Sequence, residues 1–143
     1  MKRQTWNWKE ARLPEETLHK LQADFEIGLF EAVTATEPQN IEALMILGDL
    51  YSRNGLLEKG LEVDKKLIEI QPREPLYYYN LACTHSLLGH IDPAFQALSR
   101  AVQLGYDKLE HLIDDPDLAN LKNDGRYDAL LQKLQGGQSE LTG

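Results

Sequence analysis

The sequence reads IEALMILGDLYSRNGLLEKGLEVDKKLIEIQPRE over residues 41–74 and PLYYYNLACTHSLLGHIDPAFQALSRAVQLGYDK over residues 75–108. The two stretches are each 34 residues long, and Gly55 of the first aligns with Gly89 of the second. Apolar residues recur at helical spacing on both sides of these glycines. A period of this length is typical of solenoids in which each repeat is a pair of helices joined by a tight turn.

The aligned positions carry the residues that close packing of two helices requires. Leu44, Leu47 and Tyr51 recur at i, i+3 and i+7, which predicts one apolar stripe along a helix. Gly48 lies on that stripe and would allow a second helix to approach backbone to backbone. Gly55 is expected to end the helix, because glycine takes the left-handed cap conformation without strain. The expected repeat-packing residues are Leu44, Leu47, Gly48, Tyr51, Gly60, Pro72, Tyr78, Leu81, Ala82, Ala94 and Ala101.

This order of residues resembles the tetratricopeptide repeat (TPR): a large residue, then Leu-Gly, then Tyr, then small residues in a second helix, then Pro. Residues 111–131 are also similar to the C-terminal segment that closes many bacterial TPR proteins. The resemblance implies a small bacterial-type TPR protein with an all-α fold. The expected architecture is a short right-handed solenoid of antiparallel helix pairs, with full repeats at residues 41–74 and 75–108.

The remaining segments are predicted as end units, which a solenoid needs in order to cover its terminal faces. Residues 14–40 are expected to form a degenerate leading repeat, of which only one helix, roughly residues 15–36, is clear. Residues 109–135 are expected to form capping helices. Residues 1–13 are interpreted as an N-terminal arm and residues 136–143 as a flexible tail.

Four residues in this scheme have two readings each. Trp6 and Trp8 either fold back over the open end of the solenoid or anchor a partner. Asp64 stands where the family usually carries a large aromatic residue, so it is either a hydrogen-bonded or solvated carboxylate or a functional acid. His85 replaces the usual Tyr, and is either a core histidine with satisfied ring nitrogens or a source of pH-dependent stability.

Charge and cysteine content exclude several classes of function. The net charge is −8, from 15 Lys and Arg against 23 Asp and Glu, which disfavours nucleic acid and anionic membranes as partners. The single cysteine, Cys83, excludes an intramolecular disulfide and fits a reducing compartment. The sequence has no apolar run of signal-peptide or membrane-spanning length. A cytoplasmic protein is therefore expected.

The candidate catalytic and metal-binding groups do not converge in the sequence. Cys83 and His85 are two residues apart on one helix, so they cannot act as a nucleophile–base pair. Asp114, Asp115 and Asp117 lack the spacing of a calcium loop and are interpreted as helix caps. The four histidines have no zinc-ligand spacing, and no phosphate-binding loop is present. We therefore expect no catalytic residues, no metal and no cofactor.

The TPR resemblance implies that the first helices of successive repeats line a concave groove that binds a polypeptide. Carried over by position, the groove residues are Glu42, Met45, Asp49, Ser52, Leu76, Tyr79, Asn80, Cys83 and Ser86. The clamp with which some TPR proteins grip a C-terminal carboxylate needs Lys, Arg and Asn side chains. Its positions here hold Met45, Asp49, Asn80, Glu110 and Asp114. Only the Asn fits, so this mode of binding is disfavoured.

The sequence thus predicts a non-enzymatic interaction module that binds a neutral or basic polypeptide segment. Met45 and Tyr79 would form the adaptable centre of the groove, between Glu42 and Asp49. Arg at Met45 together with Ala at Tyr79 is expected to abolish binding and leave helicity intact. Two alternatives remain open: these residues are plain solvent-facing surface, or the protein is a self-associating structural subunit of a larger assembly. The expected oligomeric state is a monomer or a weak homodimer.

Overall fold

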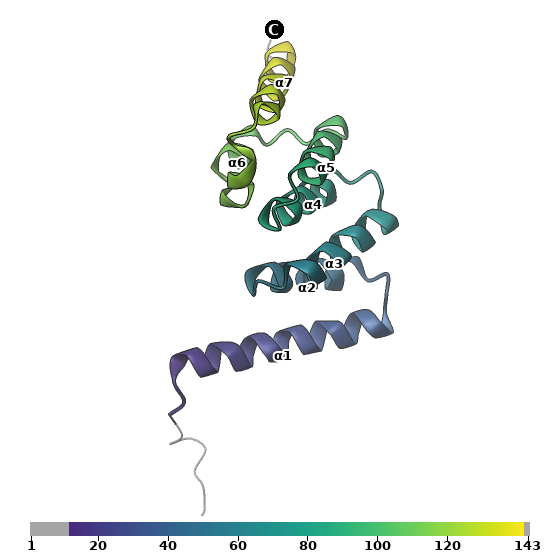
Figure 1. Ribbon diagram of the computed structural model, residues 1–143. Helices are drawn as coiled ribbons and strands as arrows, with labels where there is room; N and C mark the ends of the chain where they lie inside the picture. The colour runs from purple at the N-terminus through teal and green to yellow at the C-terminus, as the bar shows by residue number, and fades with distance from the viewer. Residues whose placement is uncertain (1–11, 142–143) are drawn as a thin grey trace, which may run out of the picture.

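The structure is a computed structural model that describes residues 12–141, with side chains as far as Gly137. Its elements are α1 (Glu15–Thr36), α2 (Ile41–Arg53), α3 (Leu57–Ile70), α4 (Pro75–Leu87), α5 (Ile91–Gln103), α6 (Leu109–Asp114), the 3₁₀ helix η1 (Pro116–Leu121) and α7 (Gly125–Leu141). The helices stack in chain order (Figure 1). The predicted all-α solenoid is confirmed. Trp6 and Trp8 lie outside the described residues.

The two repeats form the predicted helix hairpins, α2 with α3 and α4 with α5. The turns contain Gly55 and Gly89, whose φ angles of +73° and +77° lie in the left-handed region that favours glycine. Asn40 caps α2, because its side-chain oxygen accepts a hydrogen bond from the Ala43 amide at 3.0 Å. No described helix is both long enough and apolar enough to cross a membrane.

The small residues lie where the paired helices meet. A Cβ atom added to Gly48 would lie 3.2 Å from Val63 Cγ1 of α3, so a larger side chain would force α2 and α3 apart. Ala82, Ala94 and Ala101 are fully buried. Pro72 is exposed, and its carbonyl accepts a hydrogen bond from the Tyr78 hydroxyl at 3.0 Å. The close approach of the helices therefore depends on the small residues.

Replacing Gly48 and Gly28 by larger residues should change the free energy of unfolding in opposite directions. Gly48→Val should destabilise the protein by about 1–3 kcal/mol, because it overpacks the α2–α3 contact. Gly28→Ala should stabilise dilute protein by roughly 0.5–1 kcal/mol, because a Cβ at this mid-helix position meets nothing within 4 Å. Urea denaturation measures both. Destabilisation by Gly28→Ala, or a neutral effect of Gly48→Val, would contradict the packing described.

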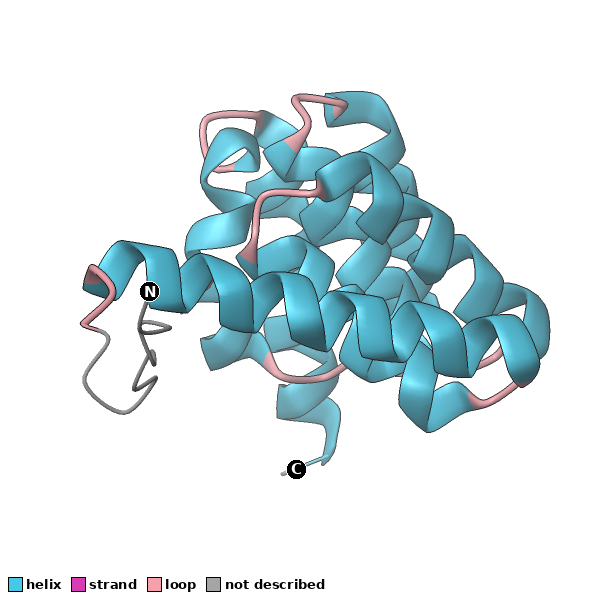
Figure 2. Cartoon of the chain, turned by 90° about the horizontal axis from the view of Figure 1, so that it is seen from below, coloured by secondary structure: helices cyan, strands magenta, loops and turns pink. Residues whose placement is uncertain are grey.

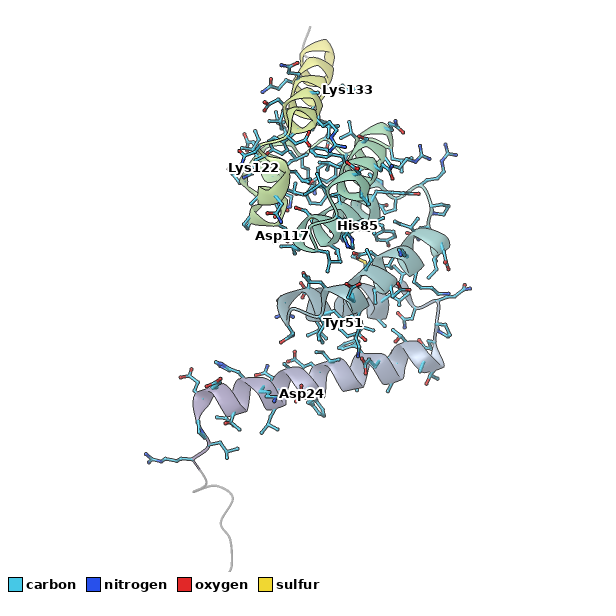
Figure 3. The ribbon with its side chains drawn as sticks, in the orientation of Figure 1. Asp24, Tyr51, His85, Asp117, Lys122 and Lys133 are labelled. Atoms are coloured by element: carbon cyan, nitrogen blue, oxygen red, sulfur yellow. The ribbon has the colours of Figure 1, made fainter. Side chains whose placement is uncertain are left out.

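Helix α1 matches the predicted leading helix and lies at one end of the stack. Ile27 and Phe30 pack against the core of the first repeat. Tyr51 points from α2 toward α1 (Figure 3), and its hydroxyl donates a hydrogen bond to Glu31 at 2.6 Å. Lys59 of α3 lies 3.4 Å from the same carboxylate. Within residues 12–141 no helix precedes α1 to complete a hairpin with it.

Helices α6, η1 and α7 (residues 109–141) form a capping unit on the second repeat. Leu112, Leu118 and Leu121 are fully buried between this unit and the repeat. Helix α7 continues to Leu141, whereas the sequence predicts a flexible tail from residue 136. The reason is that glycines without a positive φ lower helix stability by only about 1 kcal/mol each and need not end a helix.

Candidate functional site

The structure contains a cleft between α2 and the capping unit, with α3 and α4 behind it. Its volume is about 420 Å³. We call it the cleft. The residues that line it are Met45, Gly48, Asp49, Ser52, Asp64, Leu67, Tyr79, Asn80, Cys83, Thr84, His111, Asp115 and Asp117. Asp117 lies on the side of the capping unit that faces α4 (Figure 3).

The cleft is acidic. Its lining includes Asp49, Asp64, Asp115 and Asp117, whereas none of the described residues that line it is Lys or Arg. His111 is the one histidine among the lining residues, and its Nε2 lies 3.7 Å from Asp115 Oδ2. The cleft should therefore attract cationic groups and repel anionic ones.

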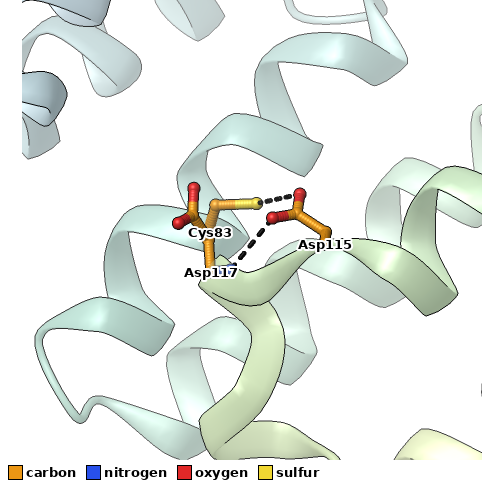
Figure 4. A group of neighbouring side chains, drawn as sticks. All are labelled: Cys83, Asp115 and Asp117. Atoms are coloured by element: carbon orange, nitrogen blue, oxygen red, sulfur yellow. Dashed lines mark hydrogen bonds between the residues drawn. The ribbon is translucent and has the colours of Figure 1, made fainter.

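Asp115 joins the capping unit to α4. Its Oδ2 accepts hydrogen bonds from the Tyr79 hydroxyl at 2.6 Å and the Cys83 thiol at 3.6 Å. Its Oδ1 accepts from the Asp117 amide at 2.9 Å, which caps η1 as the sequence predicted (Figure 4). Burial, together with the charge of Asp115, raises the pKa of Asp117. The wall of the cleft and the cap of the solenoid thus share one carboxylate.

Asp64 is a buried carboxylate that also lines the cleft. It accepts a hydrogen bond from Thr84 Oγ1 of α4 at 2.6 Å, so this carboxylate is hydrogen-bonded and not solvated. Burial raises its pKa to about 6, and the Thr84 hydrogen bond opposes that change only in part. Asp64 therefore ionises near neutral pH inside the acidic cleft.

The raised pKa of Asp64 predicts a pH-dependent stability. The folded protein holds this proton more tightly than the unfolded chain, so the stabilisation is complete below about pH 4 and is lost as pH rises through about 6. Asp64→Asn keeps an acceptor for Thr84 and should raise the free energy of unfolding at pH 7 by on the order of 1–3 kcal/mol. Urea denaturation of both proteins from pH 4 to 7 measures the difference. A difference that stays constant with pH would contradict the assignment.

Comparison with known proteins assigns the repeats to a family. The sequence profile described as "Tetratricopeptide repeat" matches residues 41–74 and 76–104. The chain therefore contains two TPR repeats. It is 30% identical over 87 residues to a chloroplastic protein from Arabidopsis thaliana, over 59% of this chain and 26% of that protein. This TPR chain therefore spans about a quarter of that relative's length.

Solved TPR-type structures have the same fold. The crystal structure of MamA protein aligns with a TM-score of 0.58 and 26% identity, over 68% of this chain and 54% of that one. The crystal structure of PcrH in complex with the chaperone binding region of PopD aligns with a TM-score of 0.55 and 21% identity, over 90% of this chain and 98% of that one.

The structure brings together part of the groove expected from the TPR resemblance. Of the expected residues, those that line the cleft are Met45, Asp49, Ser52, Tyr79, Asn80 and Cys83. Glu42 and Leu76 are exposed but lie outside it. Ser86 is fully buried, and its carbonyl accepts a hydrogen bond from Asn120 Nδ2 at 2.7 Å. Ser86 therefore offers no surface to a partner, because η1 covers this part of α4.

Two of the expected groove residues are largely covered. Tyr79 is 2% exposed and Cys83 8% exposed, because the capping unit packs on the inner side of α4. The accessible rim of the cleft is formed instead by Met45, Asp49 and Ser52 of α2. Asp64, Asp115 and Asp117 were not predicted to line the groove. The sequence indicated Asp64 only as a departure from the family pattern, and Asp115 and Asp117 only as helix caps.

The side chains of Cys83, Asp115 and Asp117 offer ligand atoms within 4.8 Å of one another, a set that could hold a metal ion. However, burial, with a contribution from Asp115, raises the pKa of the Cys83 thiol. A thiol with a raised pKa stays protonated at neutral pH, which disfavours both nucleophilic attack and metal ligation. The arrangement is better suited to binding a cationic group.

His85 and His90 form a contact that the sequence spacing did not predict. Their Nδ1 atoms lie 3.2 Å apart, across the turn that contains Gly89. His85 is half-buried at the end of α4, so it is not a fully buried core histidine. Burial, the neighbouring His90 and Lys65 together lower the pKa of His85. The pair lies outside the cleft.

Proposed function

We propose that this TPR protein is an adaptor that holds a basic segment of another polypeptide in the cleft. The observation that carries the proposal is the acidic lining of the cleft. Among the described residues that line it, four are aspartates and none is Lys or Arg. The fold supports it, because TPR repeats are interaction modules and PcrH, a protein of similar fold, was crystallised with a segment of PopD. Of the neutral and basic segments that the sequence allowed, the acidic lining favours a basic one.

The bound segment would place a Lys or Arg side chain between the α2 rim and the capping unit. Asp49 is exposed on the rim, where Arg53 of α2 pairs with it at 2.8 Å and would have to share it with the ligand. Asp117 lies across the cleft from Asp49 on η1. Met45 is 40% exposed on the same side of α2 and would cover the aliphatic part of the cationic side chain. Specificity would come from the carboxylates, and contact area from Met45.

Selection of peptides tests this proposal without knowledge of the natural partner. A phage library of random peptides is selected on the wild-type protein, and the selected peptides are then tested on the variant Met45→Arg/Asp49→Lys. We expect peptides enriched in Lys or Arg that the variant does not retain. Enrichment of acidic peptides, no enrichment, or equal retention by the variant would contradict the proposal.

The variant Met45→Arg/Asp49→Lys replaces the combination of Met45→Arg with Tyr79→Ala that the sequence suggested. Tyr79→Ala would damage the core, because Tyr79 is buried under the capping unit. Loss of binding by that variant would then report unfolding. Met45 and Asp49 are both exposed, so their replacement should change the cleft without changing the fold.

A further inference from the structure

Helix α1 carries a second apolar stripe on the side that faces away from the solenoid. Phe25 is 70% exposed, and Leu18, Leu21 and Leu29 are each about half exposed. Figure 2 views the molecule from below, where α1 crosses in front of the other helices. No described helix covers this side of α1, which is the free end of the stack in Figure 1. A helix that is apolar on two sides is typically buried on both.

The two stripes lie on opposite sides of α1. The inner one contains Ile27 and Phe30, which pack against the first repeat. The outer one follows the spacing of an a/d seam, with exposed positions that alternate three and four residues apart. These positions are Leu18, Leu21, Phe25, Gly28, Ala32 and Ala35. The spacing is that of a helix that packs against another helix along its whole length.

The outer stripe is graded in size. Its N-terminal half carries Leu18, Leu21 and Phe25, whereas its C-terminal half carries Gly28, Ala32 and Ala35. The separations between these positions are 3, 4, 3, 4 and 3 residues, so the pattern is the same in both chain directions. A second α1 placed antiparallel would therefore set each large residue against a small one, Phe25 on Gly28, Leu21 on Ala32 and Leu18 on Ala35. A Cβ on Gly28 would meet nothing within 4 Å, so space is open for the Phe25 ring.

We propose that a second copy of this chain covers the outer face of α1 in an antiparallel, two-fold symmetric homodimer. A two-fold interface needs a self-complementary surface, and this size gradient provides one. The seam spans residues 18–35, roughly 27 Å of helix at 1.5 Å per residue. It is smaller than a standard interface, so the dimer is expected to dissociate at micromolar concentrations. Because each chain has a net charge of −8, added salt should strengthen the dimer.

Sedimentation equilibrium over about a hundredfold range of micromolar concentration tests the interface. The wild-type mass should rise from monomer toward dimer. Phe25→Glu and Leu21→Glu should each stay monomeric, since they place charges in the seam. His19→Glu adds the same charge to an exposed position of α1 off the seam and should associate as the wild type does. A wild-type protein that stays monomeric, as when another segment of the chain covers the face, would overturn the proposal, and so would Phe25→Glu that associates normally.

Disulfide formation on a Cys83→Ala background tests the antiparallel register. Leu21→Cys and Ala32→Cys proteins are oxidised separately and as a mixture. In the proposed register position 21 faces position 32 of the other copy, whereas two copies of position 21 lie roughly 16 Å apart along the seam. Disulfide-linked dimers should therefore form in the mixture alone. Dimers from either single variant, or none from the mixture, would overturn the register.

The dimer does not depend on the cleft. The cleft lies between α2 and the capping unit, and none of its lining residues belongs to α1. Loss of peptide binding in the cleft variant and loss of association in the α1 variants are therefore separate results.

Discussion

Replacement of Tyr79 by alanine is expected to destabilise the protein by about 3–5 kcal/mol, the cost of removing a large buried aromatic side chain. Tyr79 is buried, and its ring stacks on Tyr106 with centroids 4.4 Å apart. Its hydroxyl donates a hydrogen bond to Asp115 at 2.6 Å. The substitution would leave a cavity beneath the capping unit and remove the hydroxyl that donates to Asp115.

The loss should be concentrated in the capping unit, because repeats in a solenoid contact only their neighbours. Amide hydrogen exchange should show lost protection in α6, η1 and α7 and retained protection in α2 and α3. Tyr79→Phe is the matched control. It keeps the stacking and removes the hydroxyl, so it should cost about 1–2 kcal/mol in urea denaturation. If the two substitutions cost the same, the ring packing would not be what holds the capping unit.

The double substitution Met45→Arg/Asp49→Lys is expected to weaken binding of a selected basic peptide by about 100-fold or more. It places two cations at the rim of the cleft, where like charges opposed across an interface cost several kcal/mol. Fluorescence anisotropy with the labelled peptide measures the dissociation constant. Circular dichroism should show an unchanged fold.

A second double variant controls for the change in net charge. Leu56→Arg/Glu58→Lys makes the same change in net charge at two exposed positions, the N-cap and first turn of α3, outside the cleft. It should bind the peptide nearly as the wild type does. Equal loss in both variants would mean that overall charge, and not the cleft, governs binding.

The solution conditions should affect wild-type binding in a defined direction. The pKa of Asp64 is about 6, so binding of a cationic side chain should strengthen as pH rises through this value and the carboxylate ionises. Added salt should weaken it, since the attraction is between charges. The α1 dimer has the opposite expected response to salt, which separates the two associations.

The repeats could be predicted from the sequence because their determinants are local. Gly48 and Ala82 occupy the same place in two aligned stretches, and the structure places both against a neighbouring helix. The bounds of α1 follow equally from Pro14 at its start and Pro38 beyond its end. In each case the evidence lies within one or two turns of the residue concerned.

The cleft could be predicted only on the α2 side. The TPR resemblance placed Tyr79 on the inner face of α4, but it cannot show whether another element covers that face. The covering element is η1, which lies where the 34-residue period has decayed. Asp115 and Asp64 reach the cleft from segments far apart in the chain, through hydrogen bonds to α4 that no spacing rule encodes. The contact of His85 with His90 was missed for a related reason, since it spans a turn.

Titration of the ¹⁵N-labelled protein with the selected peptide tests most directly whether a basic segment binds in the cleft. Chemical shift changes are expected for the amides of Gly48, Asp49, Ser52 and Asp117, which border the cleft on both sides. They should be absent when the same peptide is added to Met45→Arg/Asp49→Lys. Changes confined to α1, α5 or α7, or unchanged shifts around the cleft, would contradict the account.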